Sequence, residues 1–512
     1  MAMMPPIVRT KQLRSYYDFR GGLNTDAALD NMLDNELVRA DNVDLLERGG
    51  IVKRKGYVRL NEEHYGFQVE QIIEWPRDSG ESWLLAIVGP NLCRIREDQS
   101  YQAEILAPVA SDKIGHFFLQ DKFYFVDGQS YRVYDGSTVE NVEPYDDETN
   151  DLEPIKRCRF VVRHPNSYRI FAAGDSQNPT ALYFSEPNDP TYFKETNVLH
   201  PTTGDGPVQG LAVFGDALVV FYRHSLWVWR GTDPETDAVW HKVPSGVGTM
   251  APWSVDLTPN SMTFLGEGGL YAISPAILGF DVTIEPTEGM VLNLAKNKVE
   301  KLIREIRDPS RATGIFDAKN QRYLLACTDA EGVRNNQILV FDWNLGAFTR
   351  YTGIAVNHFL YRLNGDLLAA TNGFIIKMGV GYRDHDQPIP MDVLTKAYNL
   401  DFPFHKKRLL RLYCSFRQPD QETSKITLRL YVDDILRAEI LEEGLYENFV
   451  WGKSIWGEAI WGFRNTITTR TRIYGSGHRV QVQFFNDQLD DPTTVYGIAF
   501  EFRPSRAKGR LL

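Results

Sequence analysis

The sequence has few cysteines and no long apolar run, and both shortages exclude classes of protein. Four cysteines occur among 512 residues, far apart and without a Cys-x-x-Cys pair: Cys93, Cys158, Cys327 and Cys414. This spacing excludes a disulfide framework and predicts buried free thiols rather than a zinc site. No segment approaches the roughly 18 apolar residues that cross a bilayer, and residues 1–20 lack the apolar core of a signal peptide. We therefore expect no membrane insertion.

Basic residues are also in short supply, with 56 Lys and Arg against 67 Asp and Glu and a formal net charge of −11. A protein that grips nucleic acid needs a Lys or Arg for each phosphate contact, so tight binding over the whole surface is excluded. The same charge suits a passage through which DNA slides without being held. The composition, 43% hydrophobic and 24% charged, is that of a folded globular chain, and the length predicts two to four domains.

Catalytic signatures are missing as well. The sequence contains no HExxH, GxSxG or GxxxxGK[ST] motif, and its ten histidines include no pair at metal-ligand spacing. Two look-alike segments, GEGG at residues 266–269 and YVDD at residues 431–434, fit turns between strands better than a phosphate loop or a metal site. We predict no enzyme, no cofactor and no metal. The carboxylates Glu186 and Asp189 leave glycosidase action open, because sequence does not give their separation.

Internal repeats are the strongest feature that is present. Seven windows of β-forming residues, each split by a turn, begin at residues 81, 121, 167, 216, 260, 320 and 364. Successive starts lie 40 to 49 residues apart, except for the interval of 60 from residue 260 to residue 320. This spacing is typical of four-stranded propeller blades. We predict an all-β chain with a six- or seven-bladed β-propeller over residues 61–384; a tandem array of β-sandwiches is the alternative.

The remaining segments complete the predicted organisation. The long interval contains a helix-like pattern, predicted as an inserted helix at about residues 290–308, with Val299, Leu302, Ile303 and Ile306 on one face. Residues 1–60 are predicted as an N-terminal arm with a short helix, whose residues 51–60 supply the strand that closes the propeller. Residues 385–512 contain six longer alternating segments and are predicted as a separate jelly-roll-like β-sandwich.

Two features are candidate interfaces. The segment VWGKSIWGEAIWGF at residues 450–463 places Trp451, Trp456 and Trp461 five residues apart, which is neither a helical nor a strand period. These rings either fill the sandwich core or form a docking surface, since Trp is enriched at interface hot spots. The basic tail carries Arg506, Lys508 and Arg510, as a solvated end or a second partner contact.

An acidic stretch, EPYDDETNDLE, occupies residues 143–153. It lacks the ligand pattern of a calcium loop and is predicted as a solvated loop between blades. In a protein that surrounds DNA it is also a candidate channel lining, because carboxylates repel the phosphate backbone. Its candidate residues are Glu143, Asp146, Asp147, Glu148, Asp151 and Glu153.

Several segments resemble tail hub, or nozzle, proteins of short-tailed bacteriophages. Residues 19–60 begin with Gly-Gly-Leu-Asn and continue to the basic Arg-Lys-Gly-Tyr at residues 54–57, in the order found at the start of those proteins. Further similar segments are YFSEPNDPTYF at residues 183–193, residues 206–231 and residues 246–275. The resemblance covers most of the chain, and it lies more in the order of the motifs than in any one of them.

The resemblance implies a structural virion protein of the tail, assembled in the host cytoplasm. Such proteins form a ring, usually a homohexamer, below the portal and its adaptor protein. The ring gates the DNA channel, carries a tail fibre, spike or needle protein, and lets genomic double-stranded DNA pass without specific binding. Two alternatives stay open: a carbohydrate-binding or glycan-cleaving β-propeller, and a baseplate or capsid-associated protein of a long-tailed phage.

Overall fold

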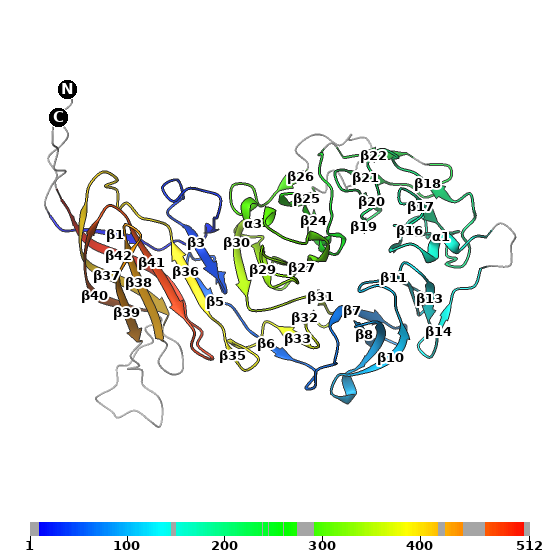
Figure 1. The fold of residues 1–512 in the computed structure, drawn as a ribbon, viewed down its shortest axis with the longest axis horizontal. Coiled ribbons are helices and arrows are strands. Elements are labelled where there is room, and N and C mark those ends of the chain that lie inside the picture. The colour runs from blue at the N-terminus through cyan, green and yellow to red at the C-terminus, as the bar shows by residue number, and fades with distance from the viewer. Residues whose placement is uncertain are drawn as a thin grey trace.

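The computed structural model shows an all-β chain with two regions side by side (Figure 1). It describes residues 10–144, 150–237, 239–243, 245–259, 261–273, 291–417, 425–443 and 466–505. One region consists of seven small antiparallel sheets and is called here the seven-sheet region. The other consists of two larger sheets and is called the sandwich region.

Seven groups of four strands follow one another along the chain and are called here the first to seventh sheets. Five are separate four-stranded sheets, the sixth continues into strands of the sandwich region as one ten-stranded sheet, and the seventh takes its fourth strand from the N-terminal part and continues into two short strands. The first three contain β7 (Val69–Pro76), β8 (Ser82–Val88), β9 (Asn91–Arg96) and β10 (Gln102–Pro108); β11 (Gly115–Leu119), β12 (Lys122–Val126), β13 (Tyr131–Tyr134) and β14 (Val139–Asn141); and β15 (Phe160–Arg163), β16 (Ile170–Ala173), β17 (Leu182–Phe184) and β18 (Val198–Leu199). The fourth and fifth contain β19 (Gly210–Phe214), β20 (Ala217–Phe221), β21 (Leu226–Trp229) and β22 (Trp240–Lys242); and β23 (Asp256–Thr258), β24 (Ser261–Gly266), β25 (Gly269–Ile273) and β26 (Val291–Asn293). The last two contain β27 (Thr313–Asp317), β28 (Arg322–Cys327), β29 (Gln337–Asp342) and β30 (Ala347–Thr352); and β31 (His358–Tyr361), β32 (Leu367–Ala370), β33 (Ile375–Met378) and β6 (Tyr57–Arg59).

The predicted repeat windows coincide with the second and third strands of these sheets. The window from residue 121, for example, contains β12 and β13, which pair as an antiparallel hairpin. Because both strands of such a hairpin are nearly all buried, each window reads as two short apolar runs around a turn. Seven windows correspond to seven sheets, and β6 pairs with β33 within the segment expected to supply a closing strand.

The sheets share their cores with their neighbours in a cyclic order. Buried side chains of the first sheet pack with those of the second, and the same holds for each successive pair up to the seventh, as Ile73 with Phe125 and Tyr124 with Ile170 illustrate. The seventh sheet packs in turn against the first through Leu368 and Ile72. The first strands of the sheets, β7, β11, β19, β27 and β31 among them, lie nearest the common centre (Figure 1).

Helices are short and few in the described chain. They are α1 (Glu153–Lys156), α3 (Glu300–Arg304), and the 3-10 turns η1 (Glu97–Gln99), η2 (Pro252–Ser254) and η3 (Pro309–Arg311). The helix predicted at about residues 290–308 is therefore shorter than expected. Its N-terminal part is strand β26, which pairs with β25, and the Asn293 side chain then accepts a hydrogen bond from the Ala295 amide. Pairing with a sheet edge overrides the helical pattern there.

The sandwich region packs a six-stranded sheet against the strands that continue from the sixth sheet. The first contains β1 (Gln12–Tyr16), β4 (Val43–Leu45), β5 (Ile51–Lys53), β37 (Lys407–Arg417), β40 (Thr466–Gly477) and β42 (Thr494–Pro504). The second contains β2 (Gly22–Leu23), β3 (Glu36–Asp41), β36 (Met391–Thr395), β38 (Lys425–Val432), β39 (Ile435–Glu443) and β41 (Val480–Asn486). Alternating residues such as Leu412, Leu428 and Phe484 fill the space between them. Two short strands, β34 (Arg383–Asp384) and β35 (Gln387–Pro388), lead from one region to the other.

The structure corrects the expected N-terminal arm. In the described part of residues 1–60 the chain forms turns and strands, and the short helix predicted there is absent. Five of these strands, β1 to β5, belong to the two sheets of the sandwich region, so this region is not confined to residues 385–512. Such pairings join residues more than 350 positions apart, and local sequence patterns carry no signal for them.

Candidate functional site

Residues 19–60 hold the two regions together and are called here the junction segment. Strand β3 pairs antiparallel with β36 of the sandwich region and touches β30 of the sixth sheet in a parallel arrangement. Further along, β5 pairs with β42, and β6 joins the seventh sheet. One stretch of chain therefore contributes strands to both regions, and the first of the segments on which the family resemblance rests is this stretch.

Arg54 is the most heavily bonded residue of the junction segment, and its side chain is 1% exposed. Its guanidinium makes a bidentate ion pair with Asp384, at 2.8 Å from Nη1 to Oδ1 and 2.6 Å from Nη2 to Oδ2. Nε donates to Asn42 at 2.8 Å, and the remaining donors reach the carbonyls of Lys55 and Thr352. A buried guanidinium is tolerated only when its donors are satisfied in this way.

Further ion pairs tie the junction segment to the sixth sheet. Arg350 on β30 makes two hydrogen bonds with Asp41, at 2.7 and 2.8 Å. Nearby, Asp44 accepts from both Arg322 and the Tyr351 hydroxyl. The Asp44 carboxylate beside Arg322 raises the pKa of that already strongly basic group. These contacts link β3 and β4 to the interior face of the sheet rather than to solvent.

Lys53 ties the same segment to the sandwich region. Its ammonium is buried and donates to the Asn486 side chain at 2.8 Å and to the Gln488 carbonyl at 2.9 Å. Burial lowers the pKa of Lys53 to about 8, because the charged form loses hydration. Lys53 and Arg54 therefore point to opposite regions, because successive side chains of an extended chain lie on opposite faces.

The Gly-Gly-Leu-Asn end of the segment holds the inserted helix. The Asn24 side chain accepts hydrogen bonds from the amides of Asp26 and Ala27. Asp26 in turn accepts from the first two amides of α3, those of Glu300 and Lys301, at 2.9 Å each. A carboxylate at a helix start satisfies amides that lack partners within the helix. The insertion is thus anchored by the N-terminal part of the chain.

Two glycines of this segment stand where a side chain does not fit. A Cβ on Gly22 would lie 2.6 Å from the Phe348 carbonyl oxygen, and the backbone there has a φ of +64°. A Cβ on Gly56 would lie 1.8 Å from the Arg383 carbonyl oxygen. Both contacts are with backbone, which cannot rotate away, so glycine is required for the close approach of the two chains.

The predicted interface residues Trp451, Trp456, Trp461, Arg506, Lys508 and Arg510 lie outside the described residues. So do Asp146, Asp147 and Glu148 of the acidic stretch. The other three acidic candidates, Glu143, Asp151 and Glu153, are exposed in the connection from β14 to β15. Asp151 accepts a hydrogen bond from the Glu153 amide, and Glu153 pairs with Lys156 within α1. They stay candidates for a channel lining.

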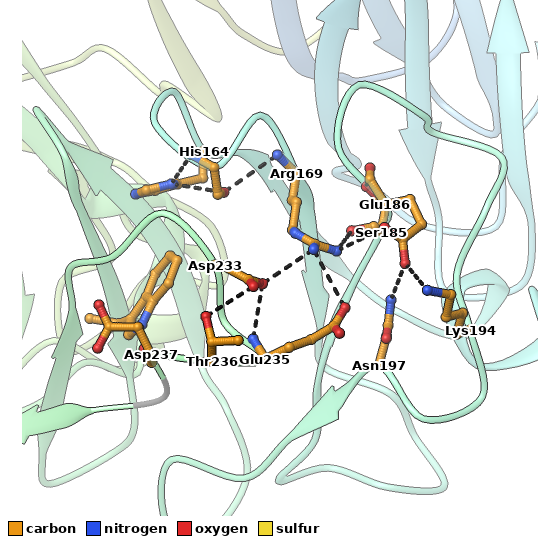
Figure 2. A network of polar contacts seen from close by, with 12 residues as sticks. His164, Arg169, Ser185, Glu186, Lys194, Asn197, Asp233, Glu235, Thr236 and Asp237 are labelled. Carbon is orange, nitrogen blue, oxygen red and sulfur yellow. Dashed lines mark hydrogen bonds and ion pairs between the residues drawn. The ribbon is translucent and has the colours of Figure 1, made fainter.

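The carboxylates considered for glycosidase action are engaged in other contacts, and Figure 2 shows those of Glu186. Glu186 pairs with Lys194 at 2.5 Å and with Arg169 at 3.4 Å. Asp189 accepts from the amide and hydroxyl of Thr191 within one turn. Glu186 is thus held between two cations, and Asp189 is held within its own turn.

Arg169 connects the third sheet to the fourth in the same network. Its guanidinium also reaches Asp233 at 3.2 Å and Glu235 at 3.4 Å, both in the connection from β21 to β22 (Figure 2). Among the described residues, no group of three or more His, Cys, Asp or Glu side chains is arranged to hold a metal ion. All four cysteines are buried free thiols, as predicted.

Sequence reasoning missed the partners that make the junction segment a site. It singled out Arg54 as part of a motif, yet Asp384, Asn42 and Asp41 had no signal of their own. Asp384 follows Arg54 by 330 positions. Its place in the loop between the two predicted domains was the only indication, because a buried carboxylate in such a loop needs a cationic partner.

The sequence matches no protein-family model and no curated protein. Solved structures with a similar arrangement include the extracellular domain of a one-component system from B. thetaiotaomicron, at 10% identity and a TM-score of 0.45, covering 87% of this chain. This chain spans 59% of the length of that structure. The WD40 domain of Neurospora crassa Pan2 has 12% identity and a TM-score of 0.39, with 66% of this chain and 97% of that one covered.

An exo-β-1,3-galactanase from Phanerochaete chrysosporium is also similar, at 9% identity and a TM-score of 0.25, covering 84% of this chain and 100% of that enzyme. At such identities and scores these likenesses carry no argument about activity. In the described parts of the chain no helix is long and apolar enough to cross a membrane.

Proposed function

We propose that this chain is a structural subunit of a phage tail hub, or nozzle. In this proposal the seven sheets form a closed seven-bladed β-propeller, and the sandwich region is its jelly-roll-like companion. Six copies form a ring below the portal adaptor. This ring surrounds the DNA channel and carries a fibre, spike or needle protein. The ring works mechanically, without catalysis.

One observation carries the proposal: the N-terminal motifs that resemble those of tail hub proteins form the junction segment. Gly-Gly-Leu-Asn anchors α3 and lies against the sixth sheet, and Arg-Lys-Gly-Tyr begins with the buried Arg54 and ends in β6. A subunit that bears the load of DNA ejection must not hinge between its parts. Residues that lock those parts together are therefore the ones that such a function requires.

The distribution of charge agrees with a channel that does not bind its contents. The net charge is −11, and Glu143, Asp151 and Glu153 are exposed on one connection of the second and third sheets. Carboxylates at a lumen wall raise the energy of nearby phosphates and prevent sticking. A lumen rich in Lys or Arg would hold the DNA instead.

The assembly state of the purified chain tests this proposal. Analytical ultracentrifugation over a wide concentration range should show a closed oligomer, with six copies as the expected number. The variant Arg54→Met removes the buried ion pair with Asp384 and leaves the surface of the subunit unchanged. It should weaken the contact between the two regions and so reduce assembly. A wild-type chain that stays monomeric at every concentration, with and without the portal adaptor, contradicts the proposal.

A further inference from the structure

A cavity of about 390 Å³ opens at the common centre of the seven sheets. Its lining comes from segments that lead into, or begin, the first strands of the sheets: Glu70 in β7, Lys113 before β11, Trp253 before β23 and Arg311 before β27. A volume of this size accommodates a ligand of one to two sugar rings. The proposed tail function does not use this cavity.

Lys113 is the unusual member of the lining. Its Nζ is buried, and no hydrogen-bond partner for it occurs among the described residues. The ammonium lies 5.7 Å from the centre of the Trp253 ring. Burying an ammonium without a partner is costly, so proteins keep such a group where a ligand or water completes its bonding. Its position in an open cavity favours a ligand.

The acids of the cavity neutralise its cations only in part. Glu70 is paired with Arg334, at 2.8 Å from Oε1 to Nη1. Arg311 makes only a half-exposed contact with Asp308, at 3.4 Å. Four cations, Lys113, Arg159, Arg311 and Arg334, line the cavity against two carboxylates, Glu70 and Asp112. The surplus is positive in a chain whose overall charge is negative, and an anionic group is the ligand that balances it.

Trp253 supplies the apolar part of the lining. It lies between this cavity and an adjoining one of about 310 Å³, and its ring is tilted against Phe160 at 6.5 Å. An aromatic wall beside a cation offers a flat surface for a ring and a partner for its charge. The amides of Asn335 and Asn357 donate to neighbouring backbone carbonyls, which holds the loops that shape the cavity.

We propose that this central cavity binds a carboxylate-bearing molecule of the size of a sugar ring, with the carboxylate on Lys113 and the ring against Trp253. The ligand class follows from a buried cation, a positive surplus and an aromatic wall in one cavity. An acidic sugar and a cyclic organic acid share this chemistry. The site does not depend on ring assembly, so its test is separate from the test of the proposed tail function.

Calorimetric titration with sodium glucuronate tests the site, with glucuronamide, glucose, cyclohexanecarboxylate and inorganic phosphate as comparisons. Glucuronate should bind, and the two uncharged sugars should bind at least about tenfold more weakly, because they lack the charge-assisted bond. Tighter binding of glucuronate than of cyclohexanecarboxylate identifies a sugar acid, and the reverse order a cyclic organic acid. Equal affinity for phosphate and glucuronate would show that no ring binds against Trp253. The absence of binding by any carboxylate would contradict the proposed site.

Two variants locate the binding on the protein. Lys113→Met keeps the length of the side chain and removes its charge, so it should abolish glucuronate binding. Lys122→Met is the matched control, because Lys122 is an exposed lysine on β12 of the same sheet and should leave binding unchanged. Wild-type affinity in Lys113→Met would contradict the proposal. Should that variant fail to fold, the glucuronate and glucuronamide comparison on the wild-type chain decides instead.

Discussion

The two regions of this protein are built in opposite ways. In the seven-sheet region, hydrogen-bonded neighbours are mostly successive strands, joined by short turns. In the sandwich region, β1 pairs with β42 and β5 pairs with β42 again, so the ends of the chain meet. Local pairing lets each sheet form from its own segment, whereas the sandwich region requires both ends of the chain. The difference teaches that residues 10–60 are a structural element of the second region more than an arm of the first.

Removal of residues 1–56 should therefore produce the largest effect. The sandwich region would lose β1 to β5 and expose its core. The seven-sheet region would keep all of its strands, because β6 begins at Tyr57. We expect limited proteolysis to degrade residues 391–512 and to spare residues 61–380. Equal resistance of both parts would show that the comparison is wrong.

Asp384→Asn sharpens the comparison at a single contact between the regions. The change leaves the buried Arg54 guanidinium without its counter-charge, and loss of one partner of a buried pair costs about 3–5 kcal/mol of unfolding free energy. Urea denaturation followed by tryptophan fluorescence measures the change. The exposed pair of Arg20 and Asp18 is the control, and Arg20→Met should leave stability nearly unchanged. A similar loss in both variants would contradict the assigned role of Arg54.

The centre of the seven-sheet region should show a pH dependence that originates at Lys113. Burial lowers the pKa of Lys113 from 10.5 to about 7, with Glu70 and Asp112 opposing the shift and Arg311 adding to it. Between pH 7 and 10.5 the unfolded chain binds a proton that the folded chain does not, so wild-type stability should rise with pH. Lys113→Met should be the more stable protein at pH 7, and its advantage should shrink toward pH 10.5. Thermal denaturation across this range measures it; a constant difference would argue against a buried ammonium.

The smallest effect is expected for Asp26→Ala. This change removes the acceptor for the first two amides of α3 and should cost about 1 kcal/mol, as loss of a helix cap does. Hydrogen exchange should become faster at Glu300 and Lys301 and stay unchanged in β37. An unaltered exchange rate at those two amides would show that α3 is held by its packing alone.

The seven sheets were predictable because each hairpin is a local pattern repeated at one period. Every window from residue 81 to residue 364 contains two strands and a turn, so the spacing of the windows was enough to predict one sheet for each. The inserted helix was predicted too long, because Val291–Asn293 carries a helical pattern but meets the edge of β25. The β39 strand was missed, since its exposed residues such as Leu436 and Leu441 do not form the alternation of a half-buried strand.

The candidate sites were less predictable, for a physical reason. The partners of Arg54 come from three separate segments, and the lining of the central cavity takes one or two residues from each of several loops. No spacing in the sequence relates such residues, because their proximity is produced by the packing of neighbouring sheets against one another. Motifs identified Arg54 and Gly56 as notable; only the three-dimensional arrangement identified Asp384 and Lys113.

A reconstruction by cryo-electron microscopy of native phage particles that carry this chain tests the central claim most directly. The account predicts a ring of six copies in the tail below the portal adaptor, with the junction segment buried inside each subunit and no ordered contact between basic side chains and DNA. Density for this chain at another site in the particle, or a complete tail without it, would contradict the account.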